Sequence, residues 1–163
     1  MIYYIQNEND GAYIYPNKKR ANFTALSVIK NICIEHLTSL ESYLKAVKNI
    51  LDSRYRIPIV LSSKYAFFST KAMRNIDSIW INYFAVKEII YLEKTIMFIF
   101  DVHHRLEIEI SSKNYQRLVS IIFKVLKYKS SLEWIHFQLI IYWQPLCVHG
   151  IISIRKTIYI KET

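Results

Sequence analysis

Few side chains in this 163-residue chain are of types and spacings that could bind a metal ion. Cys33-x-x-His36 is one pair, and Cys147-x-His149, far later in the chain, is another. Thiolates and imidazoles are ligands that zinc takes, but the second spacing is too tight for common structural zinc sites. A buried Cys33 that acts as a small hydrophobic residue, with His36 near a helix start, explains the first pair better. We therefore expect no metal ion and no other cofactor.

Sequence signatures of catalysis are missing as well. Glycine stands only at positions 11 and 150, so neither common type of glycine-rich phosphate loop can form. The chain has no Gly-x-Ser-x-Gly, His-Glu-x-x-His or Cys-Gly-x-Cys motif. Glu107 and Glu109 share one face of an expected strand, and a solvated strand edge explains that pair. The sequence therefore predicts a protein that is not an enzyme.

Positive charge is the strongest chemical feature of the sequence. Its 22 Lys and Arg outnumber 13 Asp and Glu, which gives a formal net charge of +9 and a field that attracts polyanions. Nucleic acid is the expected partner, and an anionic membrane surface is the rival, because it attracts basic proteins by the same Coulomb forces. The candidate contacts form four groups: Lys18, Lys19 and Arg20; Arg54 and Arg56; Lys71 and Arg74; and Arg117, Lys124 and Lys127.

Hydrophobic patterning predicts many short strands. From residue 57 onwards the predicted strands start about every 8 to 12 residues, which suggests a meander that curls around one core. Trp80 and Tyr83 are expected in that core rather than on a surface that stacks on bases, and Lys18 to Arg20 are expected in a basic loop. The predicted strands cover residues 2–6, 12–17, 23–34, 57–61, 65–68, 79–84, 89–91, 95–100 and 106–110.

Two segments have helical periodicity instead. Leucine and valine recur at helical spacing between residues 37 and 51, and Thr38 with Glu41 resembles a capping box, so we predict a helix over residues 39–51. A second helix is predicted from residue 114, with the hydroxyl of Ser111 or Ser112 as its N-cap. Its basic side chains lie opposite an apolar stripe made of Tyr115, Leu118, Val119, Ile122, Phe123 and Leu126.

The order of these pieces between about residues 30 and 127 resembles the ComK family, the bacterial competence transcription factors. Four segments carry the resemblance: Arg56-Ile-Pro-Ile-Val-Leu61, Tyr65-Ala-Phe-Phe-Ser-Thr70, Ile79-Trp80-Ile81 and the run from Phe100 to Ser111. One departure is at the hairpin turn, where relatives usually have Asn-Gly and this chain has Val102-His103. Because β-branched valine avoids the positive φ of a two-residue turn, we expect a longer turn or one of another type.

The resemblance implies a transcriptional activator of genes for DNA uptake and recombination. Such regulators bind double-stranded A·T-rich promoter boxes arranged as inverted repeats, largely through the minor groove. Inverted repeats imply a two-fold assembly and hence a homo-oligomer. Arg54, Arg56, Lys71 and Arg74 are the favoured contacts, because loops at one end of a sheet can converge and arginine suits a narrow A·T minor groove. An adaptor that delivers the protein to a Clp-type protease is also implied.

The expected fold is α+β, with a curled antiparallel sheet or partly open barrel closed by a C-terminal amphipathic helix, similar to a pleckstrin-homology arrangement. Residues 1–128 would form this domain. Residues 129–163 are a divergent C-terminal segment, which could be a hairpin packed on the domain, an interface or a poorly ordered end. Residues 132–143 could be a helix or a strand, and residues 152–161 alternate like a strand.

The expected location is the cytoplasm, in association with the nucleoid. Residues 1–5 lack the basic region of a secretory signal, and two cysteines do not form a disulfide framework. The longest candidate membrane span, residues 134–154, is interrupted by Pro145 and Gly150, so no membrane span is expected. Two other functions stay open: a pleckstrin-homology-like module that binds an anionic membrane or a protein partner, and a degenerate ComK paralogue without DNA binding.

Overall fold

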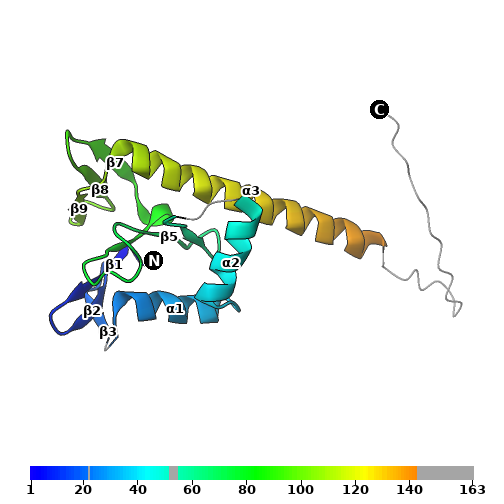
Figure 1. The fold of residues 1–163 in the computed structure, drawn as a ribbon, viewed down its shortest axis with the longest axis horizontal. Helices are drawn as coiled ribbons and strands as arrows, with labels where there is room; N and C mark the ends of the chain where they lie inside the picture. The colour runs from blue at the N-terminus through cyan, green and yellow to red at the C-terminus, as the bar shows by residue number, and fades with distance from the viewer. Residues whose placement is uncertain (22, 52–54, 143–163) are drawn as a thin grey trace, which may run out of the picture. The chain divides into compact units, whose positions relative to one another are not determined.

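Figure 1 shows the computed structural model of the chain, which describes residues 1–21, 23–51 and 55–142, with residues 133–142 described by their backbone alone. Contacts within the chain divide it into two units, Met1–Leu126 and Lys127–Thr163. The sheets, α1, α2 and the first half of α3 belong to the first unit.

The first three strands form a hairpin with an added edge strand. They are β1 (Tyr4–Glu8), β2 (Gly11–Ile14) and β3 (Lys19–Ala21). The strands predicted over residues 2–6 and 12–17 are confirmed as β1 and β2, which pair as an antiparallel hairpin. Gly11 closes its turn at φ +140°, and a Cβ there would lie 2.6 Å from the carbonyl oxygen of Ala21, so glycine is required. The predicted basic loop is wrong for Lys19 and Arg20, which lie in β3 and pair with β2.

Helix α1 (Ala25–Glu35) replaces the strand that the sequence predicts over residues 23–34. The segment is rich in β-branched residues, which favour strands. The Thr24 side chain nevertheless accepts a hydrogen bond from the N–H of Ser27 at 3.3 Å and caps a helix. The strand prediction is wrong because the buried positions recur every three or four residues, as one face of a helix requires: Ala25, Val28, Ile29, Ile32 and Cys33.

Helix α2 (Leu40–Leu51) confirms the predicted helix over residues 39–51. Its N-cap is Ser39 and not Thr38, because the Ser39 hydroxyl accepts a hydrogen bond from the N–H of Ser42 at 3.1 Å. The Glu41 carboxylate contacts the ammonium group of Lys30 in α1 at 2.7 Å.

The remaining strands build two antiparallel sheets, so the single predicted meander is wrong. The first sheet has the order β3-β2-β1-β6-β5-β4, and the second has the order β7-β8-β9. β1 pairs with β6 far along the chain, which breaks the meander. The α+β class with a C-terminal helix is confirmed, and the sheets do not close into a barrel. The strands are β4 (Ile59–Val60), β5 (Ala66–Ser69), β6 (Trp80–Asn82), β7 (Glu88–Tyr91), β8 (Ile96–Ile99) and β9 (Arg105–Ile108), with a short 3₁₀ helix η1 (Tyr83–Ala85) after β6.

Helix α3 (Ser112–Tyr142) begins after Ser111, whose hydroxyl accepts the N–H of Asn114 at 3.3 Å and confirms the predicted cap. Its buried face is rotated from the predicted stripe. Phe123 is 54% exposed, whereas Ile121 and Val125 are buried. Phe123 instead meets the ring of Tyr83 edge-on, with centroids 6.0 Å apart. The helix continues to residue 142, and the predicted strand over residues 152–161 lies outside the described residues.

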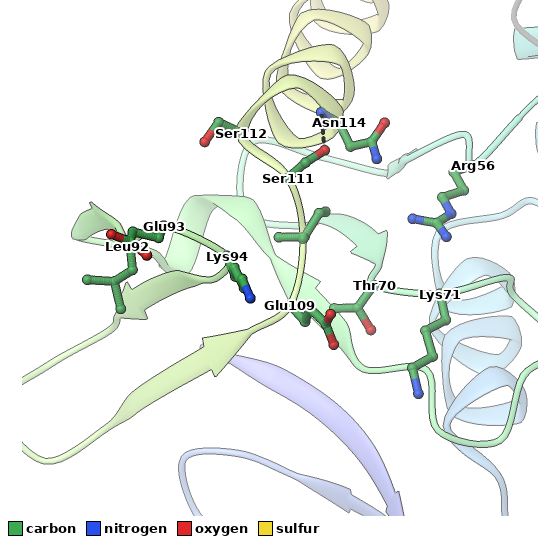
Figure 2. A pocket seen from close by; sticks show the side chains of 11 residues that line it. Arg56, Thr70, Lys71, Leu92, Glu93, Lys94, Glu109, Ser111, Ser112 and Asn114 are labelled. Atoms are coloured by element: carbon green, nitrogen blue, oxygen red, sulfur yellow. Dashed lines mark hydrogen bonds between the residues drawn. The ribbon is translucent and has the colours of Figure 1, made fainter.

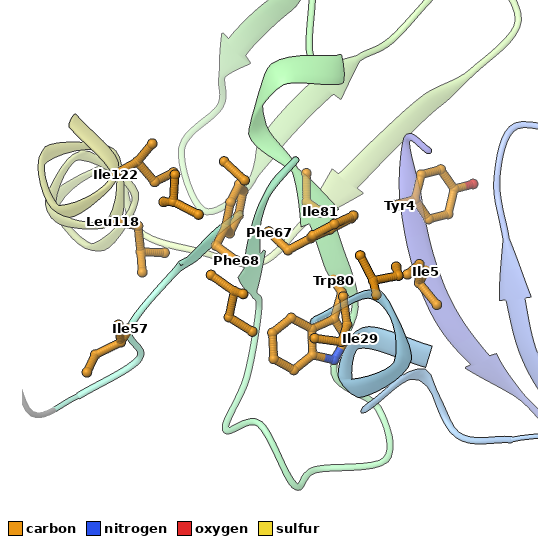
Figure 3. Packing of buried hydrophobic residues seen from close by; sticks show 14 of the residues in the cluster. Tyr4, Ile5, Ile29, Ile57, Phe67, Phe68, Trp80, Ile81, Leu118 and Ile122 are labelled. Atoms are coloured by element: carbon orange, nitrogen blue, oxygen red, sulfur yellow. The ribbon is translucent and has the colours of Figure 1, made fainter. Parts of the chain in front are cut away.

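Strands β5 and β6 of the first sheet are buried on both faces. Trp80 faces α1, where Ile29 lies beside it, and its burial confirms its predicted place in the core (Figure 3). Phe68 faces the opposite way, and its ring lies 5.9 Å from that of Phe98 in β8 and 5.8 Å from that of Tyr115 in α3. α1 therefore covers one face of this sheet, and the second sheet with the start of α3 covers the other.

Asn82 in β6 joins three separate parts of the backbone. Its side chain is fully buried; Nδ2 donates to the carbonyl oxygens of Ile2 at 2.9 Å and Lys64 at 3.0 Å, and Oδ1 accepts the N–H of Ala66 at 3.1 Å. Without the amide these three backbone groups would lose this partner, and for the N–H of the fully buried Ala66 that loss is costly.

We expect Asn82→Ala to lower the free energy of unfolding by about 3 kcal/mol, because it removes this partner from three backbone groups. Chemical denaturation followed by circular dichroism measures this. Asn49→Ala, on the exposed face of α2, is the matched control and should change stability by less than about 0.7 kcal/mol. Equal effects of the two substitutions would contradict the role given to Asn82.

The turn between β8 and β9 is longer than two residues, as the sequence predicts. Phe100 donates its N–H to the carbonyl oxygen of His104 at 3.0 Å, which leaves three residues in the loop. Asp101 Oδ1 accepts the N–H groups of His103 and His104, each at 2.8 Å, and lies 2.9 Å from Nδ1 of His104. Burial raises the pKa of Asp101, but the hydrogen bonds from His104, His103 and Tyr3 outweigh it and hold the pKa well below its usual value.

Asp101→Asn tests this pKa shift. The unfolded chain binds a proton at residue 101 before the folded protein does, so wild type loses stability as the pH falls below the ordinary aspartate pKa of 3.8. The stability difference between wild type and variant should be constant above about pH 5 and shrink as the pH falls towards about 2. Denaturation curves at several pH values measure it, and a difference that does not change with pH would refute the shift.

Candidate nucleic-acid interface

Two of the candidate arginines lie against one exposed tyrosine, Tyr55, which is 61% exposed. The Cζ of Arg56 lies 5.2 Å from the ring centroid of Tyr55, and the Cζ of Arg117 in α3 lies 5.8 Å from it. Arg117 Nη1 also donates to the carbonyl oxygen of Tyr55 at 2.9 Å. These distances suit cation–π attraction, which orders guanidinium groups at a surface. We call Tyr55, Arg56 and Arg117 the Tyr55 cluster.

Arg56 has an unusual backbone and an unsatisfied side chain. Its φ of +45° lies in the left-handed region, which costs a residue with a side chain roughly 1–2 kcal/mol. Its Nε atom is buried and has no hydrogen-bond partner in the part of the chain that the structure describes. Strain and an open donor at one residue are typical of positions kept for binding rather than for stability.

Arg56 also lines a pocket of about 680 Å³ (Figure 2). Lys71, from the loop after β5, and Lys94, from the turn between β7 and β8, line the same pocket. Its remaining wall includes the residues that begin α3, Ser111 and Ser112 among them. The structure thus brings Arg56 and Lys71 together from separate loops.

The other candidates are not gathered there. Lys18 pairs with Glu8 at 3.8 Å, and Arg20 pairs with Asp10 at 3.4 Å, so carboxylates neutralise this hairpin locally. Arg54 lies outside the described residues. The remaining candidates are exposed: Lys19 in β3, Arg74 in the loop before β6, Lys124 on α3, and Lys127 at the start of the second unit.

Charge compensation separates the Tyr55 cluster from the hairpin. Within the part of the chain that the structure describes, Arg56, Arg74 and Arg117 take part in no ion pair with a carboxylate. Lys71 does pair with Asp77, at 3.4 Å. The charges of these three arginines therefore remain available to an anionic partner.

Sequence reasoning missed Tyr55 and Lys94. Tyr55 precedes Arg56 directly, and an aromatic residue beside arginine is the only signal that the sequence offers for it. Lys94 sits in a turn between two strands and has no local pattern, because its place in the pocket depends on how the second sheet approaches α3.

Cys33 does not belong to a metal centre in the described part of the chain, where no group of three His, Cys, Asp or Glu residues could hold a metal ion. Its side chain is fully buried, and burial raises its pKa to about 11. Cys147 and His149 lie outside the described residues. No described helix combines the length and the apolar character needed to cross a membrane.

A basic α+β domain with an uncompensated arginine surface belongs to the class of proteins suited to anionic partners. The model of the ComK family, described as ComK protein, matches residues 6–129, and the chain belongs to this family. It is a family of competence transcription factors and not of enzymes. Comparisons with curated proteins and with solved structures gave no match.

The state of the Cys33 thiol is testable by labelling with a disulfide reagent at pH 8 in a Cys147→Ser background. Because the thiol is buried and stays protonated at this pH, we expect labelling to be slow without denaturant and to accelerate with global unfolding. Labelling of the folded protein as fast as that of the unfolded chain would contradict this description of the core.

Proposed function

We propose that the protein is a sequence-selective DNA-binding activator of competence genes that recognises A·T-rich promoter boxes. The observation that carries the proposal is the Tyr55 cluster, in a chain whose family consists of transcription factors. Its two guanidinium groups are ordered by one ring and have no carboxylate partner among the described residues. Arginines ordered in this way can contact phosphates or enter a narrow minor groove.

The loop between β5 and β6 supports the proposal because it is braced. The N–H of Lys71 donates to the Ser78 hydroxyl at 3.4 Å, and Asn7 Nδ2 donates to the carbonyl oxygen of Ile76 at 2.6 Å. Arg74 is exposed on this loop. A loop that is already ordered loses less entropy on binding than a mobile one.

Helix α3 extends the basic surface. Arg117 and Lys124 are seven residues apart and therefore lie on one side of the helix, two turns apart. Each phosphate that such side chains neutralise releases condensed counterions, so affinity should fall steeply as salt is added.

The proposal has consequences for assembly and location. Promoter boxes in inverted repeats require a two-fold protein assembly, so the active form would be a homo-oligomer. The protein would act on the chromosome, in the cytoplasm, and an adaptor with a Clp-type protease would limit its amount.

The test compares two duplexes, one with two A·T-rich boxes and one of G·C sequence, by fluorescence anisotropy at several salt concentrations. We expect tighter binding to the A·T-rich duplex and a clear salt dependence. Arg117→Gln should weaken binding about tenfold and reduce the slope of log K against log salt by about 1. Lys18→Gln is the matched control and should change affinity less than about twofold, because Glu8 already neutralises Lys18.

Anionic vesicles are the competing ligand in the same series. Preference for the duplex at matched charge supports the proposal. Equal affinity for both duplexes, or stronger binding to vesicles, would refute it and favour a membrane-binding module.

A further inference from the structure

We propose that the pocket lined by Arg56, Lys94 and the N-terminus of α3 binds a phosphate group. This inference rests on the proposed function for the source of the phosphate, which would be the DNA backbone. The binding chemistry is independent of it, because a free phosphorylated molecule would use the same donors. With a volume of about 680 Å³, the pocket has room for a phosphate and for the groups attached to it.

The pocket collects positive charge from segments far apart in the sequence. Arg56 precedes β4, Lys94 lies in the turn between β7 and β8, and both line the pocket with Lys71. Figure 2 shows Arg56 and Lys71 on one side of the pocket and Lys94 on the other. The ammonium group of Lys71 pairs with Asp77, so Arg56 and Lys94 are the principal cations.

The start of α3 adds backbone donors. The N–H of Asn114 bonds to the Ser111 hydroxyl, and the N–H of Tyr115 bonds to the Ser111 carbonyl oxygen. The N–H groups of Ser112 and Lys113 precede the first intrahelical bond and have no partner in the described part of the chain. The first turn also holds no acidic side chain, so the positive end of the helix dipole is not compensated there.

Arg56 is the second and independent observation that points to an anion. Its side chain lines the pocket, and its Nε has no hydrogen-bond partner among the described residues. The guanidinium N–H groups of a side chain that lines a pocket can donate charge-assisted hydrogen bonds to phosphate oxygens. None of the ion pairs among the described residues uses Arg56 or Lys94.

Two glutamates, Glu93 and Glu109, also line the pocket. Both are exposed, so solvent screens their repulsion of an anion without removing it. Substitutions of the two kinds of charge should therefore have opposite effects: loss of a cation should weaken phosphate binding, and loss of the Glu109 charge should strengthen it.

The experiment titrates inorganic phosphate into the ¹⁵N-labelled full chain at constant ionic strength, with chloride as the reference anion. We expect saturable shifts of the amide signals of Ser112 and Lys113. Arg56→Gln should raise the phosphate Kd about tenfold, since hydrogen bonds to charged groups contribute at that scale. Lys94→Gln should raise it as well, Glu109→Gln should lower it, and Lys45→Gln, on the exposed face of α2, should leave it unchanged.

Shifts that chloride reproduces, or equal effects of Arg56→Gln and Lys45→Gln in folded protein, would overturn the site. A second arm adds the A·T-rich duplex to the phosphate-saturated protein. Displacement of phosphate by the duplex supports a backbone phosphate as the ligand. If phosphate binding is saturable and the duplex does not displace the phosphate, the site is supported, with a small phosphorylated molecule as its ligand. That result would contradict only the use of the site in DNA binding.

Discussion

The whole arrangement depends on the pairing of β1 with β6, two strands that are far apart in the sequence. This pairing inserts the N-terminal hairpin beside the central strands and places Ile2 within reach of the Asn82 amide, which also holds the turn before β5. Both faces of β5 and β6 are then buried, by α1 on one side and by the second sheet and α3 on the other. Such non-local pairing carries a loop-closure entropy cost that local pairing does not, so it forms slowly.

The same constraint positions the Tyr55 cluster. The segment after Arg56 is held by Tyr43 of α2, whose hydroxyl donates to the carbonyl oxygen of Pro58 at 3.0 Å and accepts the N–H of Val60 at 2.8 Å. Burial raises the pKa of this hydroxyl to about 12, so it stays protonated and keeps donating. Arg56 therefore stands at the edge of a fixed segment, and α3, packed through Tyr115 on Phe68, brings Arg117 to it.

The sequence predicted the elements whose signals are local. The hairpin of β1 and β2, the helix from Leu40 and the Ser111 cap follow from turn residues, periodicity and hydroxyl caps within a few positions. The strand over residues 23–34 failed because β-branched composition competed with a helical spacing of buried positions. Phe123 was misplaced because the apolar stripe is wide enough for two orientations, and only packing against the sheet decides between them.

The candidate site was predictable in part, for a reason that concerns charge rather than fold. A run such as Lys18-Lys19-Arg20 is the most conspicuous basic feature of the sequence, yet Glu8 and Asp10 across the hairpin neutralise two of its members. Arg56 and Arg117 are less conspicuous in the sequence, and neither pairs with a carboxylate of the described residues. The net charge of +9 sets the long-range attraction of polyanions, but contact affinity depends on cations that need not first give up a partner. Ion pairing across the hairpin thus distinguishes Lys18 and Arg20 from Arg56 and Arg117, and that pairing is a property of the sheet order, which no local pattern encodes.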